Sequence, residues 1–166
     1  MARGLQTLQV LTLLSVAAGV TAGYLVAAGI VPIAAHIRLG FLIALLVAFT
    51  HSMTLFYLIG SSGNVREAIK PHGWNEYLPQ MASFHRVLSP WLTLAIVAGI
   101  LAVITGGGAH TRVWPSWLHQ GTALAALAVN GAAAWKGVGV IAANVRLQRR
   151  LDASLRKAGG ESGAQP

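Results

Sequence analysis

The sequence predicts an all-α integral membrane protein, a bundle of four transmembrane helices that run up, down, up and down. Its 166 residues are 55% hydrophobic and only 10% charged, whereas soluble domains carry roughly 25% charged residues. The mean hydropathy is +0.62. Four apolar stretches each reach the roughly 20 residues that a helix needs to cross a bilayer. Backbone groups in lipid must be satisfied within the segment, so these stretches are predicted to be helices.

The four helices are expected at about residues 5–31, 37–60, 81–105 and 117–143. The first ends at Pro32, and "GGG" at 106–108 is expected to end the third. The first stretch is longer than the roughly 7–15-residue core of a signal peptide, so it is interpreted as an uncleaved helix. Short connections after the first and third helices predict antiparallel neighbours, and hence a bundle over residues 1–144. The second connection, 61–80, is expected to be a long loop.

The distribution of Lys and Arg predicts that both termini and the long loop are cytoplasmic, because cytoplasmic segments are enriched in these residues. The side opposite to them is expected to hold only Arg38 and Arg112. This topology suits the bacterial cytoplasmic (inner) membrane. The ten basic residues predicted on the cytoplasmic side are Arg3, Arg66, Lys70, Arg86, Lys136, Arg146, Arg149, Arg150, Arg156 and Lys157.

Residues 145–166 are predicted to form a basic cytoplasmic helical extension, followed by a disordered end, "GESGAQP". Leu147, Leu151 and Leu155 recur every four residues. Such a basic helix would dock on anionic lipid or on a partner subunit, or it would be a solvated tail. The pI of 11.2 does not indicate nucleic-acid binding, because the basic residues flank apolar stretches and no nucleic-acid-binding motif is present.

The composition excludes several kinds of site. The chain has no cysteine, which excludes disulfides, zinc-thiolate sites and covalent c-type haem attachment. All four acidic residues lie outside the predicted spans, which argues against a di-iron carboxylate site and against a carboxylate-based cation transporter. No phosphate-binding loop or nucleophile motif is present, so the sequence leaves open whether the protein is an enzyme. The acidic residues are Glu67, Glu76, Asp152 and Glu161.

His51 lies in the middle of the apolar stretch "LVAFTHSMTLFYLIG". An ionisable residue within a membrane span is costly and is by default a functional-site hypothesis. Four explanations remain open at this stage. In the first, His51 would ligate a haem iron, and in the second it would ligate another metal. In the third it would relay protons or bind a quinone. In the fourth it would be a neutral imidazole that joins two helices through a local hydrogen bond.

The haem hypothesis depends on His85, which is expected at a similar depth on the following helix. A b-type haem needs two axial imidazoles from facing helices and cations for its propionates. His51 and His85 are the predicted ligands and Arg86 the predicted propionate partner, with Ser83 and Ser89 beside them. Small residues such as Gly40 and Ala44 would leave room for the macrocycle.

A second group of histidines is predicted near the outer face: His36, His110 and His119. His36 and His119 would ligate a second haem, or they would bind copper or zinc together with His110. The third interpretation is that they are histidines at the membrane interface, each with one edge of the ring exposed to water. Gly19 and Gly23, four residues apart, allow close approach of another helix.

The stretch "ASFHRVLS" resembles the S-x-x-H-R-x-S stretch of the membrane-anchor subunits of succinate dehydrogenases. The resemblance covers about eight of the 166 residues, at the third helix, whereas family anchors carry the stretch at an early helix. It implies roles for Ser83, His85 and Arg86 near a quinone or a haem, and it leaves the ligand role to His51.

These observations predict a small membrane-integral b-type cytochrome, or a quinone-reactive anchor subunit, that passes electrons within a larger bacterial membrane complex. The expected cofactors are haem b and quinone, and the expected partners are the lipid bilayer and other subunits. Two alternatives stay open. The chain would be a cofactor-free structural or assembly subunit, or a membrane protein that handles metal or protons through its histidines.

Overall fold

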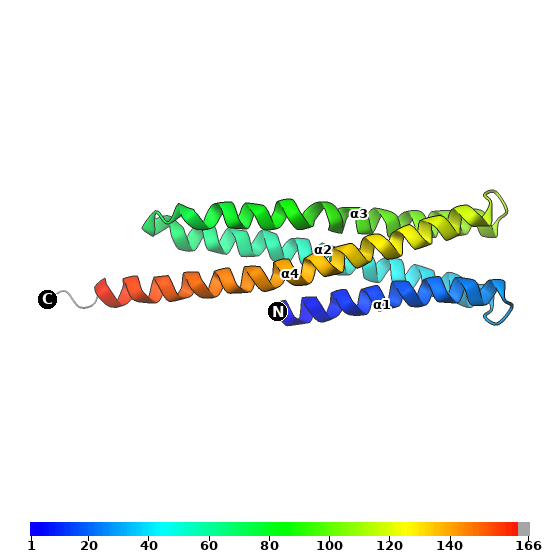
Figure 1. Cartoon of the computed structure of the whole chain (residues 1–166), viewed down its shortest axis with the longest axis horizontal. Coiled ribbons are helices and arrows are strands. Elements are labelled where there is room, and N and C mark those ends of the chain that lie inside the picture. The colour runs from blue at the N-terminus through cyan, green and yellow to red at the C-terminus, as the bar shows by residue number, and fades with distance from the viewer. Residues whose placement is uncertain (163–166) are drawn as a thin grey trace.

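The protein is built of four long helices. The structure, a computed structural model, describes residues 1–162 and their side chains as far as Gly159. The predicted all-helical class is confirmed (Figure 1). Each of the four helices is long and apolar enough to cross a membrane. The helices are α1 (Ala2–Ala27), α2 (Ile33–Ile69), α3 (Leu78–His110) and α4 (Ser116–Ser162), with two short 3-10 turns, η1 (Lys70–His72) and η2 (Asn75–Tyr77), between α2 and α3.

The helices follow one another around the bundle, so that each packs on its neighbours in the chain and α4 closes the ring against α1. As a result, α2 and α4 lie diagonally across the bundle. The turns after α1 and α3 lie at one end, the loop end, and the connection from α2 to α3 lies at the other (Figure 1). Because α2 and α4 both begin at the loop end, their first turns lie at the same level.

Two tight turns form the loop end. The first contains Gly29 with φ +74°, a left-handed conformation that glycine adopts without steric cost. Pro32 then precedes α2, and its ring prevents α1 from continuing. The second turn contains Arg112 with φ 58°, which is uncommon for a residue with a side chain.

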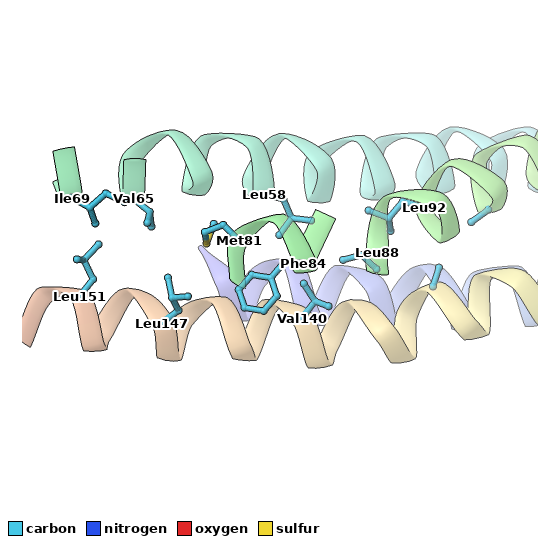
Figure 2. Close-up of a cluster of buried hydrophobic side chains, with 12 residues drawn as sticks. Leu58, Val65, Ile69, Met81, Phe84, Leu88, Leu92, Val140, Leu147 and Leu151 are labelled. Atoms are coloured by element: carbon cyan, nitrogen blue, oxygen red, sulfur yellow. The ribbon is translucent and has the colours of Figure 1, made fainter. Parts of the chain in front are cut away.

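The bundle has two halves of different construction. Helix α1 has 26 residues, whereas α2 has 37 and α4 has 47. The N-terminus therefore lies about midway along the bundle, and the half away from the loops contains only α2, α3 and α4 (Figure 1). Buried apolar side chains form one cluster between α2, α3 and α4, which extends from this three-helix half into the part of the bundle that α1 also flanks (Figure 2). They are Leu58, Val65, Ile69, Met81, Phe84, Leu88, Leu92, Ala95, Ala133, Val140, Leu147 and Leu151.

Two helices extend beyond the ends that the sequence predicts. Helix α2 continues through "SSGNVREAI" to Ile69, because Val65 and Ile69 are buried in the core while the polar residues between them face outward. Helix α3 continues through "GGG" to His110 and remains helical at Pro90. The long loop predicted over 61–80 is therefore mostly helix.

The C-terminal extension is part of the bundle core. Leu147 and Leu151 are only 2% and 3% exposed, and Leu155 packs against the same cluster. These leucines face α2 and α3, so they are not free to dock on lipid as one of the sequence interpretations required. Helix α4 includes residues 160–162, and the rest of the predicted disordered end, 163–166, lies outside the described residues.

Polar side chains lie inside the bundle while many large apolar ones lie outside. His51, Asn130 and Asn144 are at most 1% exposed. On the outer surface, by contrast, Phe56 is 67% exposed and Trp135 is 84% exposed. The core is mainly apolar, as in soluble proteins, but polar side chains are buried within it and large apolar side chains form much of the outer surface.

Candidate functional site

A cavity of about 600 Å³ lies inside the bundle at its loop end, between all four helices. Cofactor and ligand pockets typically measure about 300–1,000 Å³. The wall is largely aliphatic, and all four helices contribute residues with little or no side chain to it. These small residues are Gly19, Gly23, Gly40, Ala44, Gly99, Ala102, Gly106, Ala123 and Ala126. The space therefore exists because glycine and alanine recur along this part of the interior.

Two histidines lie opposite each other in this cavity. The ring centroids of His36 and His119 are 6.1 Å apart, and their planes are inclined at 66°. His36 lies in the first turn of α2 and His119 in the first turn of α4. Because these turns are level and diagonal, both imidazoles reach the centre of the bundle.

The hydrogen bonds leave a nitrogen of each ring available. His119 Nδ1 lies 3.1 Å from the carbonyl oxygen of Ala102. A carbonyl only accepts, so Nδ1–H donates and the neutral ring keeps its lone pair on Nε2. This is the arrangement that metal-ligating histidines usually adopt. His36 Nδ1 is buried without a hydrogen-bond partner within the described chain.

Glycines allow the backbones of the flanking helices to lie against these rings. A Cβ atom at Gly106 on α3 would lie 3.0 Å from His119 Cε1, and one at Gly23 on α1 would lie 3.3 Å from His36 Cε1. Glycine is common where a backbone must approach another group closely. The glycine pair in α1, interpreted from sequence as a helix-packing feature, thus also makes room for a histidine.

His51 lies deeper in the bundle and is held by α4. Its Nε2 is 2.8 Å from Asn130 Oδ1, and Asn130 Nδ2 donates to the carbonyl of Ala126. The amide of Asn130 is thereby oriented, so its Oδ1 accepts from His51 Nε2–H. Asn130 also lines the inner end of the cavity. This geometry corresponds to the fourth explanation offered for His51, a neutral imidazole that joins two helices.

The structure does not bring His51 and His85 together. His85 Nε2 is 2.8 Å from Ser62 Oγ, and Ser62 lies about 16 Å further along α2 than His51 at the usual helical rise. The sequence placed the two histidines at similar depth because it ended α2 near residue 60, whereas α2 extends to Ile69. Each of the two histidines has its own hydrogen-bond partner on another helix.

The other residues predicted around His85 lie away from the cavity. Ser83 is exposed and donates to the carbonyl of Gln80. Arg86 is exposed and Ser89 half-buried, and neither lines the cavity. His110, in contrast, is exposed and lines the cavity at the loop end.

Within the described residues, no three or more His, Cys, Asp or Glu side chains come together as a metal site. His36, His119 and His110 therefore do not form the three-ligand copper or zinc site that the sequence left open. What the cavity offers to a metal is one pair of opposed imidazoles.

The fold and the site together define an all-helical bundle with an apolar, cofactor-sized cavity between two histidines. The chain matches no model of a known protein family, no curated protein and no solved structure. The eight-residue resemblance to succinate dehydrogenase anchors thus receives no support from these comparisons. Its spacing also differs, since Ser83, His85, Arg86 and Ser89 read S-x-H-R-x-x-S.

Replacing His51 by leucine is expected to lower the free energy of unfolding by about 1–2 kcal/mol, because it leaves the buried Asn130 oxygen without a donor. The double variant His51→Leu/Asn130→Leu should recover part of this loss. Unfolding in mild detergent, measured for both single variants and the double variant, gives the coupling free energy. Strictly additive losses would show that the hydrogen bond does not join α2 to α4.

Proposed function

We propose that this chain is a small membrane-integral b-type cytochrome that holds one haem between His36 and His119. The observation that carries the proposal is the pair of opposed imidazoles inside a cofactor-sized, mainly aliphatic cavity. The function is the one that the sequence predicts, but the proposed ligands are the outer histidines in place of His51 and His85.

The spacing of the two rings suits one metal ion between them. Imidazole nitrogens bind metals at about 2 Å, so two imidazoles on opposite sides of one ion have ring centroids about 6 Å apart. The observed separation is 6.1 Å. A direct packing contact between two histidines does not need a cavity around it, whereas a cofactor does.

The number of ligands favours haem over a bare metal ion. Protein sites for zinc usually have at least three protein ligands, and the described residues offer two here. A porphyrin brings four nitrogens of its own, so two axial imidazoles complete the six positions. A haem held by His36 and His119 would supply one-electron transfer.

The outer surface favours insertion in a membrane. Helix α1 is about 39 Å long, which exceeds the hydrocarbon core of about 30 Å. Exposed large apolar residues lie along all four helices, and Trp117 at the loop end is 68% exposed, as interfacial tryptophans are. By the distribution of Lys and Arg, the cavity would lie toward the outer face of a bacterial inner membrane. A partner subunit or a quinone would exchange electrons there.

A reduced-minus-oxidised visible spectrum of the purified protein tests the proposal. We expect a b-type α-band, and a pyridine haemochrome assay should give one haem per chain. The protein should be produced in cells supplied with a haem precursor and purified in mild detergent. A protein that is folded by circular dichroism but has no haem band, even after addition of hemin, would contradict the proposal. That result would favour the alternative function, a cofactor-free structural or assembly subunit.

A further inference from the structure

Polar residues are unevenly distributed along the cavity wall. At the loop end the wall contains Arg112, His110 and Ser116, all of them exposed, so the cavity opens to the surface there. Toward the inner end, apart from Asn130, the wall is made of glycine, alanine, valine and isoleucine. A flat ligand that is apolar at one edge and anionic at the other would fit this wall in one orientation, with its anionic edge at the loop end.

Arg112 is the one residue of this wall that carries a permanent charge, and the described residues place no acidic side chain near it. The four acidic residues are Glu67, Glu76, Asp152 and Glu161. They belong to the end of α2, to η2 and to the end of α4, whereas Arg112 lies in the turn between α3 and α4. An arginine binds a carboxylate through charge-assisted hydrogen bonds that are often bidentate.

The backbone at Arg112 adds a second observation. Arg112 has φ 58°, and it is the one residue other than glycine with positive φ in the described chain. Glycine or asparagine would adopt this conformation at lower cost. Strained residues of this kind concentrate at ligand-binding sites. The arginine therefore occupies a position where the backbone alone would favour another residue.

We propose that Arg112 binds a carboxylate of the porphyrin held in the cavity and so fixes which edge of the ring faces the surface. This inference rests on the proposed function and deepens it. The propionate edge lies at the loop end beside Arg112 and Ser116. The apolar edge lies inward, toward Asn130. The sequence assigned the propionate to Arg86, which is exposed and outside the cavity wall.

The test compares Arg112→Gly with Arg112→Lys and with the control Arg38→Gln. Arg38 is exposed and bonds to the carbonyl of Ala34, and it does not line the cavity. Haem loss to excess apomyoglobin gives the dissociation rate. We expect about tenfold faster loss from Arg112→Gly, because a charge-assisted hydrogen bond is removed. Arg112→Lys should recover part of the affinity, and Arg38→Gln should behave as the wild type.

Haem dimethyl ester, which lacks the carboxylates, shows whether the effect of Arg112 depends on a carboxylate of the ligand. The melting temperature of the haem-free protein then shows whether the substitution affects folding. The wild type should lose the ester faster than haem, whereas Arg112→Gly should lose both at similar rates. The melting temperature of the haem-free Arg112→Gly protein should be unchanged or higher, since glycine relieves the positive φ. Equal haem retention by the wild type and Arg112→Gly would overturn the role of Arg112. A wild type that binds no haem would instead overturn the proposed function.

Discussion

His119→Ala and His36→Ala are each expected to abolish the low-spin b-type spectrum, because each variant removes one of the two proposed axial ligands. The protein should still be produced and folded, since neither side chain belongs to the buried apolar core. The measurement is the reduced-minus-oxidised spectrum, recorded together with circular dichroism. Exogenous imidazole should restore the low-spin spectrum, because it can occupy the space that the deleted ring leaves.

Two other histidine variants serve as controls for this experiment. His85→Gln removes a side chain that is hydrogen-bonded to Ser62, and His72→Ala removes an exposed one that stacks on Trp74 in the connection between α2 and α3. Both should keep the haem band. The opposite result would be loss of the band in His51→Leu and His85→Gln, with retention in His36→Ala and His119→Ala. It would indicate that His51 and His85, the pair first predicted from the sequence, hold the iron.

Leu147→Ala is expected to lower the free energy of unfolding by about 2–5 kcal/mol, the usual cost of truncating a buried leucine. Leu147 is 2% exposed and belongs to the core that α4 shares with α2 and α3 (Figure 2). Denaturant titration in detergent micelles provides the measurement. The matched control is the neighbouring Arg146→Ala, which alters an exposed residue and should change stability by less than about 0.5 kcal/mol. Equal, small effects of both variants would indicate a solvated tail.

The number and class of the elements follow from the sequence, whereas several of their ends do not. Hydropathy and Pro32 were sufficient to predict four helices and the first turn. "GGG" at 106–108 was expected to end a helix because glycine disfavours helix. The helix continues because Gly106 packs against His119, a contact that no local pattern contains. In the same way, Val65 and Ile69 keep a polar segment helical by packing on other helices.

The candidate site was predicted in part. The sequence grouped His36 with His119 because both were expected at the outer boundary, and the structure brings them within 6.1 Å of each other. It gave priority to His51 and His85, since the early predicted end of α2 made their depths agree. Opposed imidazoles require that α2 and α4 are diagonal, which depends on the packing order of the helices. Gly23 and Gly106 were the available signal, because each lies against a histidine ring.

The buried apolar cluster between α2, α3 and α4 has a consequence for the proposed electron transfer. In the described chain, Leu58, Leu88, Leu92 and Ala133 close the interior below the cavity, each of them 0% exposed. From the level of His36 to that of Leu58 is about 33 Å of helix. If the proposed haem is bound there, an electron on it would be expected to leave on the face of the membrane where it entered. Such an exchange would carry no electron across the bilayer through this chain.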